Sequence, residues 1–245
     1  VGVPIYVGMG YCFKEFIEAI SEIDYPNYDI LLVDNSKTQT FFNELKNLEK
    51  TKRIKVLYDP TKEEKNYNRV CSSKQIIINY AKENNYDYIL FMDADTIPSP
   101  QVFERVAETA REDVIGSCTA YSPTPKLLPH LVVWFTNFVR WSGIVKGMST
   151  LIFCHRSLVH KKNIWFDETC NLGEIYDFIR RARIYGGAKF VYLRVNPGYE
   201  IASDRFEHWG YIKGSVFWIH WTVKCYFLGL PTGDLERLYW ERKYQ

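Results

Sequence analysis

The sequence predicts an α/β protein with an open, mostly parallel sheet that is flanked by helices. Apolar runs of strand length recur in the first half of the chain, at residues 3–8, 28–33, 54–58 and 88–92. Between them, apolar residues three and four positions apart predict helices at residues 13–23, 41–48 and 72–84. Strands that alternate with helices are typical of parallel βαβ units in a doubly wound sheet.

The second half of the chain is less regular but continues the same pattern. Helices are predicted at residues 101–111 and 172–185, and strands at residues 114–118, 149–154 and 189–193. No linker-like segment or internal repeat interrupts the sequence. We therefore expect one domain at residues 1–205, followed by an aromatic-rich C-terminal extension at residues 206–245 that packs on or beside it.

The composition excludes several classes of protein. Hydrophobic residues make up 47% of the 245 residues and charged residues 24%, which is ordinary for a globular protein and excludes a disordered or coiled-coil chain. The net charge of +2, without a long basic run, argues against nucleic acid as a partner. The six cysteines stand singly, so neither a zinc site nor a disulfide framework is expected.

Aromatic residues are abundant, at 16% of the chain. Many lie in two apolar stretches, residues 127–141 and 215–230, which are shorter than the roughly 20 residues that span a bilayer. We expect a soluble protein that is cytoplasmic, or peripheral to the cytoplasmic face of a membrane. The two stretches could contact lipid headgroups, stack on a sugar, form an oligomer interface or pack as core helices.

Carboxylates follow two of the predicted strands. Asp34 comes after the run at residues 28–33, and Asp93-Ala94-Asp95 comes after the run at residues 88–92. Ligands of open α/β sheets bind at the carboxyl ends of the strands, so these residues are candidates for a site. Two carboxylates placed two residues apart suit Mg²⁺ or Mn²⁺, which complete their shells with water and substrate phosphates. The alternative is that these side chains only cap turns, Asp34 through Ser36 and Thr38.

Four segments in order resemble nucleotide-sugar-dependent glycosyltransferases of the GT-A fold, and most closely those of family 2. They read IYVGMG at residues 5–10, LLVDNS at residues 31–36, MDAD at residues 92–95, and FDE, GEIYDF and RAR within residues 166–183. The resemblance spans residues 3–193. It implies a Rossmann-like sheet of the GT-A type and a nucleoside-diphosphate sugar donor that is linked to UDP or GDP.

The resemblance also implies which residues hold the donor and the metal. The donor nucleotide would contact Val7, Gly8, Asp34, Asn68, Lys74, Asp93 and Ala94. The Mn²⁺ or Mg²⁺ ion would be held mainly by Asp95, together with Asp93 and with His208 from the C-terminal segment. Asp34 could accept a hydrogen bond from uracil or guanine, and Lys74, near the predicted helix start, could pair with phosphate. Alternatively, Lys74 belongs to a solvated basic turn, and His208 is a surface or packing residue.

Two positions depart from the family pattern. The opening loop reads GMGY at residues 8–11 where the family commonly has PTYN, and Ile175 stands where the second acid of a Glu-Asp pair is expected. In inverting members an acid in this region is implied to be the base that deprotonates the acceptor, which leaves Glu174 and Asp177 as catalytic candidates. They lie three apart on a predicted helix and could share a face. They could instead be exposed acids balanced by Arg180, Arg181 or Lys189.

These features together predict a metal-dependent glycosyltransferase that moves a single sugar with inversion. The hydroxyl acceptor would be a glycan, a lipid-linked molecule or a small molecule. The processive signature QxxRW is absent after the acidic segment, which favours single transfer. The alternatives are a retaining GT-A glycosyltransferase and a non-catalytic sugar- or nucleotide-binding protein on the same fold. A nucleotidyltransferase would need a glycine- and arginine-rich loop after the first strand, which residues 8–12 do not supply.

Overall fold

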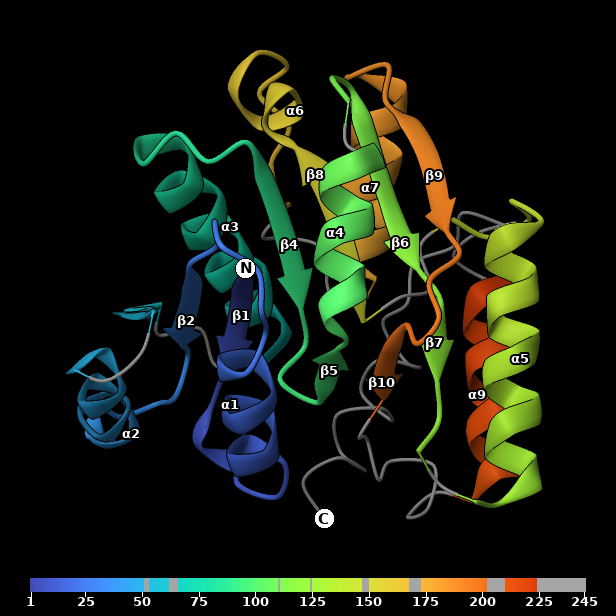
Figure 1. Ribbon diagram of the computed structural model, residues 1–245, viewed down its shortest axis with the longest axis horizontal. Helices are drawn as coiled ribbons and strands as arrows, with labels where there is room; N and C mark the ends of the chain where they lie inside the picture. The colour runs from blue at the N-terminus through green and yellow to red at the C-terminus, as the bar shows by residue number, and fades with distance from the viewer. Residues whose placement is uncertain are drawn as a thin grey trace.

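The computed structural model describes residues 1–50, 53–61, 66–109, 111–123, 125–146, 150–167, 173–201 and 210–223. Within these residues the main sheet has seven strands in the order β3-β2-β1-β4-β8-β6-β9 (Figure 1). In that order the strands span Ile54–Tyr58, Ile30–Asp34, Gly2–Ile5, Tyr88–Met92, Leu151–His155, Val114–Cys118 and Lys189–Leu193.

The strands β3, β2, β1 and β4 are parallel, and β6 and β9 are also parallel. β8 runs antiparallel to both of its neighbours, β4 and β6. The predicted α/β class with a mostly parallel sheet is therefore confirmed. The parallel arrangement brings the carboxyl ends of β2, β3 and β4 to one edge of the sheet.

Helices cover both faces of the sheet because residues alternate along the strands. In β2, Ile30 and Leu32 pack in one core with α1 (Phe13–Ser21) and α4 (Pro100–Thr109). Leu31 and Val33 face the other core, which contains apolar residues of three further helices. These helices are α3 (Asn66–Glu83), α6 (Arg156–His160) and α7 (Glu174–Ile184).

A second, three-stranded sheet lies beside the main one, with the order β5-β10-β7 (Figure 1). Its strands are Thr96–Pro98, Tyr199–Ile201 and Ala120–Tyr121. β10 pairs antiparallel with β5 and parallel with β7. Strands of two or three residues have too little alternation to be predicted from sequence, and these three form only through pairing between distant segments.

The remaining elements lie at the two sides of the molecule. α2 (Thr40–Leu45) and the 3₁₀ helix η2 (Lys46–Lys50) pack near β3, and a short 3₁₀ helix, η1 (Val7–Met9), follows β1. At the opposite side, α5 (Leu127–Trp141) packs on β7 and against α9 (Tyr211–Thr222) (Figure 1). Within the described residues, none of the helices combines the length and the apolar character that crossing a membrane requires.

Several predicted boundaries were wrong. β1 ends at Ile5 rather than at residue 8, because the chain turns into η1. α3 begins at Asn66 rather than at residue 72, so that Lys74 lies in the helix interior and not near its start. The division at residue 205 stays a prediction, because residues 202–209 and 224–245 lie outside the described part of the chain.

Candidate active site

The Asp93-Ala94-Asp95 segment forms the turn between β4 and β5. The backbone N–H of Asp93 donates to the carbonyl of Thr150 at 3.0 Å, and the N–H of Thr96 donates to the carbonyl of Asp93 at 3.0 Å. The side chain of Asp93 is 46% exposed, whereas Asp95 is buried. Oδ1 of Asp95 has no hydrogen-bond partner among the described residues. A buried carboxylate oxygen without a donor is costly, which marks it as an acceptor for a ligand.

Asp34 ends β2 at the same edge of the sheet. Its Oδ1 accepts hydrogen bonds from the N–H and the hydroxyl of Ser36, at 2.9 and 2.6 Å. The Ser36 hydroxyl oxygen accepts in turn from the N–H of Val7, at 2.9 Å, which fixes the loop containing Gly8 against this turn. Turn capping, which was the alternative role for Asp34, therefore accounts for its Oδ1 only. Oδ2 is buried and makes no hydrogen bond of standard geometry with the described residues; burial raises the pKa of Asp34, while the nearby backbone N–H of Phe42 lowers it to a smaller extent.

A third strand-end carboxylate, Asp59, was missed by the sequence analysis. It follows β3, is buried, and accepts hydrogen bonds from the hydroxyls of Ser72 and Ser73 at 3.1 and 2.9 Å. Arg69 of the same helix donates to the carbonyl of Asn35 at 3.3 Å. These contacts hold the first turns of α3 against the ends of β2 and β3. The signal was present, because Asp59 follows a predicted strand closely, as Asp34 and Asp93 do.

Lys74 is fully buried in the interior of α3, between two carboxylates. Its Nζ lies 2.8 Å from Oε1 of Glu174 and 3.9 Å from Oδ1 of Asp93, and 5.9 Å from the centre of the Phe166 ring. Burial lowers the pKa of Lys74, but the attraction of Glu174 and Asp93 outweighs it, so that the pKa lies above its usual range. Lys74 is therefore an ion-paired core residue, and the solvated basic turn is excluded for it.

The same ion pair fixes the state of Glu174. Gly173 precedes α7 with φ of 86°, a conformation that favours glycine, and Glu174 is the first residue of the helix. Burial raises the pKa of Glu174, but the charge and hydrogen bond of Lys74 lower it by more, so that the pKa lies below its usual range. Glu174 is therefore ionised at neutral pH and lies beside the Asp93-Ala94-Asp95 turn.

Asp177 has a different partner. Its Oδ2 accepts a hydrogen bond of 2.5 Å from Nε of Arg181, one helical turn on, and Arg181 also pairs with Asp167. Arg181 therefore balances the charge of Asp177, as the alternative to a catalytic role predicts. Ile175 packs in the core beneath α7, which leaves no acid at that position.

The carboxylates of the Asp-x-Asp turn suit a divalent cation. Magnesium is commonly bound by one or two carboxylates and completes its shell with substrate phosphates and water. Asp95, with its unpaired buried oxygen, and the half-exposed Asp93 provide such a pair. No group of three or more His, Cys, Asp or Glu residues close enough to hold a metal occurs in the part of the chain that the structure describes. His208 lies outside that part, and the side chain of Asn68 is not described.

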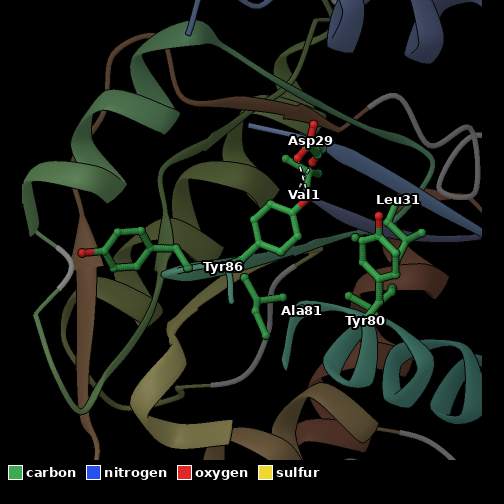
Figure 2. Close-up of a pocket in the computed structure, with 10 residues that line it drawn as sticks. Val1, Asp29, Leu31, Tyr80, Ala81 and Tyr86 are labelled. Carbon is green, nitrogen blue, oxygen red and sulfur yellow. Dashed lines mark hydrogen bonds between the residues drawn. The ribbon is translucent and has the colours of Figure 1, made fainter. Parts of the chain in front are cut away.

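One pocket in the structure is distant from these residues. It is lined by Val1, Leu31, Tyr80 and others, and the hydroxyl of Tyr86 donates to Asp29 inside it (Figure 2). Val1, Asp29 and Tyr86 precede β1, β2 and β4, so the pocket lies at the amino ends of these parallel strands. It is at the edge opposite to Asp34 and Asp95 and contains none of the predicted site residues.

The mixed sheet, with strand-end carboxylates at one edge and a second small sheet after the Asp-x-Asp turn, defines a protein of the GT-A fold. Residues 1–156 match the family model of glycosyl transferase family 2, which is more than half of the chain. The chain therefore belongs to that family, as the sequence motifs indicated. No curated protein sequence matches the chain.

Solved structures agree on the fold. S. aureus TarS in complex with UDP superposes with a TM-score of 0.60 at 17% identity, over 81% of this chain and 58% of that one. The mannosyltransferase PcManGT from Pyrobaculum calidifontis, in complex with GDP-Man and Mn²⁺, superposes with a TM-score of 0.54 at 16% identity, over 78% of this chain and 52% of that one. The chain thus spans little more than half the length of these similar proteins.

Proposed function

We propose that this protein transfers a single sugar from a nucleoside-diphosphate sugar to a hydroxyl acceptor, with a divalent cation and with inversion at the anomeric carbon. The observation that carries the proposal is a pair of buried carboxylate oxygens without partners, Oδ2 of Asp34 and Oδ1 of Asp95, at one edge of the sheet. Each is an acceptor that a bound donor would satisfy. Ligands of open α/β sheets bind at this edge.

In this proposal the two oxygens recognise different parts of the donor. Oδ2 of Asp34 accepts a hydrogen bond from the ring N–H of uracil or guanine, because a buried acceptor without a donor gains most from a matching one. Asp95, with Asp93, holds Mn²⁺ or Mg²⁺. When bound, this ion neutralises the charge that develops on the departing diphosphate. Structures of similar fold contain UDP, UDP-GlcNAc, and GDP-Man with Mn²⁺, which supports a donor with either base.

Glu174 is the residue that we propose as the general base. The Lys74 ammonium lies within 4 Å of carboxylate oxygens of both Glu174 and Asp93, which keeps Glu174 beside the donor site. Asp177 is paired with Arg181, whose other acidic partner is Asp167 and not a residue of the Asp-x-Asp turn. An ionised carboxylate beside the acceptor hydroxyl accepts its proton as the bond to the anomeric carbon forms.

A retaining enzyme is the second candidate, and the identity of Ile175 favours it. An apolar core residue stands where the family pattern has an acid, and retention does not require a protein base at that place. The stereochemistry of the product separates the two candidates. Non-processive transfer rests on the sequence alone and is part of the proposal.

The proposal is tested by incubating the protein with UDP- and GDP-linked sugars and simple glycoside acceptors in the presence of Mn²⁺. Nucleotide release that depends on the acceptor, together with inverted anomeric configuration by NMR, is the expected result. Asp95→Asn should abolish release, and Asp34→Asn should raise the donor concentration that release requires by roughly tenfold or more. A retained configuration would favour the second candidate. Sugar-nucleotide binding without any transfer, over a broad acceptor panel, would favour a non-catalytic binding protein.

A further inference from the structure

The outer side of α5 is an exposed apolar stripe. Exposed apolar residues recur three and four positions apart, which places them along one side of the helix. They are Leu127, Leu131, Trp134, Phe138 and Trp141. Trp134, the most central, is 64% exposed, and its ring stacks on Phe138 with centroids 5.9 Å apart. Water therefore meets a continuous row of large apolar side chains along the helix.

Two polar residues of α5, Asn137 and Arg140, face the protein, whereas His130 is exposed. Asn137 exchanges hydrogen bonds with the backbone of Ala120 in β7, at 2.7 and 3.0 Å. Arg140 is buried and donates to the hydroxyl of Tyr199 in β10, at 2.7 Å. A surface helix of a globular protein usually places its polar side outward. α5 has much of this arrangement reversed, which indicates that its outer side meets something other than water.

The neighbouring helix α9 has an exposed apolar stripe of its own. Its exposed residues follow the same spacing, and they are Ile212, Val216, Ile219 and Val223. α9 packs against α5 at one side of the molecule, away from β3 and α2 (Figure 1). We call the two exposed stripes together the α5–α9 face. An exposed apolar surface of this extent marks an interaction site.

The charged residues within the two segments that carry the α5–α9 face have one sign. Residues 125–146 and 210–223 contain no aspartate or glutamate, whereas Lys126, Lys146 and Lys213 are present. Arg194 adds a further cation, with its guanidinium 4.8 Å from the centre of the Trp141 ring. A two-fold pairing of two copies through this face would bring cations of one copy toward cations of the other, without an acid from these two segments to pair with them. An anionic surface is the complementary partner.

We propose that the α5–α9 face docks in the plane of a membrane that contains anionic lipid. Apolar and aromatic side chains would enter the headgroup region, and the cations would meet lipid phosphates. α5 packs on β7, in the same small sheet as β5, which begins immediately after Asp95. Docking would thus place the small sheet next to the membrane. This inference does not depend on the proposed sugar transfer.

The test is cosedimentation of the full chain with vesicles of phosphatidylcholine alone, or of phosphatidylcholine with phosphatidylglycerol, at low and high salt. We expect binding to the anionic vesicles that weakens with salt, and a blue shift of tryptophan emission. Trp134→Glu and Ile212→Glu should each weaken it by tenfold or more, because a charge would enter the apolar layer. Lys213→Glu should weaken it severalfold, because each cation near an anionic surface contributes about fivefold.

The matched control is Ile184→Glu, at a residue of α7 that is 61% exposed and lies outside the α5–α9 face. It should bind vesicles as the unaltered chain does. Circular dichroism and thermal unfolding verify that each variant folds. Absence of binding to anionic vesicles by the folded chain would overturn the proposal. So would sedimentation velocity showing a dimer that Trp134→Glu and Ile212→Glu dissociate, because the face would then be covered by a second copy.

Discussion

The ammonium of Lys74 lies 2.8 Å from Oε1 of Glu174, a residue one hundred positions later in the chain. The same ammonium lies 3.9 Å from Oδ1 of Asp93. One buried cation in α3 therefore joins the first residue of α7 to the Asp-x-Asp turn after β4. The candidate base and the candidate metal site thus have a common positioning residue.

Breaking the Lys74–Glu174 pair should destabilise the fold strongly. Removing one partner of a buried ion pair typically costs about 3–5 kcal/mol; Lys74→Met removes the cation of Glu174, and Glu174→Gln leaves Lys74 with only the more distant Asp93. The double variant Lys74→Met/Glu174→Gln should recover much of that loss, because both charges are removed together. Urea unfolding of the four proteins measures the coupling.

The exposed pair of Lys161 and Glu112 provides the control for this cycle. Their charged atoms are 2.6 Å apart, closer than those of the buried pair, but both side chains are more than half exposed. Lys161→Met should therefore leave the free energy of unfolding close to that of the parent protein. Equal losses at the two lysines would show that burial does not strengthen the Lys74 pair.

The buried pair also predicts how stability depends on pH. The pKa of Glu174 is lowered, so its contribution is present above the unfolded-state pKa, about 4.3, and is lost as pH falls through the lower folded-state value. The pKa of Lys74 is raised, so its contribution is present below about 10.4 and is lost as pH rises through the higher folded-state value. Unfolding free energies of the parent and Glu174→Gln should converge on the acid side.

Asp34→Asn should separate stability from donor binding. Burial raises the pKa of Asp34, so ionisation of this carboxylate in the folded protein costs stability once the pH exceeds the raised pKa. Asparagine keeps an acceptor for Ser36 and removes the charge. We expect an unchanged or higher unfolding midpoint without donor, and donor binding weaker by roughly tenfold or more, because a hydrogen bond to a charged group is lost. A lower midpoint would contradict the assigned cost of the buried charge.

Glu174 and Asp177 should differ in their effect on turnover. If Glu174 is the base, Glu174→Gln lowers kcat by about 10²–10⁴-fold, the usual contribution of a positioned base. Asp177→Asn breaks only the pair with Arg181 and should leave kcat within about tenfold, because exposed or partly exposed pairs contribute little. Initial rates for folded variants decide this. The reverse order of effects would assign the base to Asp177.

The sheet was largely predictable because its strands are continuous apolar runs. The boundaries of β3, β4, β6 and β9 agree with the sequence prediction. β5, β7 and β10 were not predicted, because they are two or three residues long and form by long-range pairing. Asp34 and Asp93 could be predicted as candidate site residues because each directly follows one of these apolar runs.

The partner of Lys74 could not be predicted from the sequence. Local pattern placed Lys74 in a polar run near a helix start, whereas the helix begins at Asn66 and buries this lysine. The pairing with Glu174 depends on how α3 and α7 pack on the same face of the sheet. Likewise, the sequence could not show that Asp177 pairs with Arg181 while Glu174 pairs with Lys74.

The most direct measurement is calorimetric titration of UDP and of GDP, each with and without Mn²⁺, into the parent protein and Asp95→Asn. The buried, unpaired oxygen of Asp95 predicts that one nucleotide binds only with the metal, and that the Asp95→Asn variant loses this binding while keeping its fold. Binding that is indifferent to Mn²⁺ and to the substitution, or no binding of either nucleotide by folded protein, would contradict the donor site proposed at this edge of the sheet.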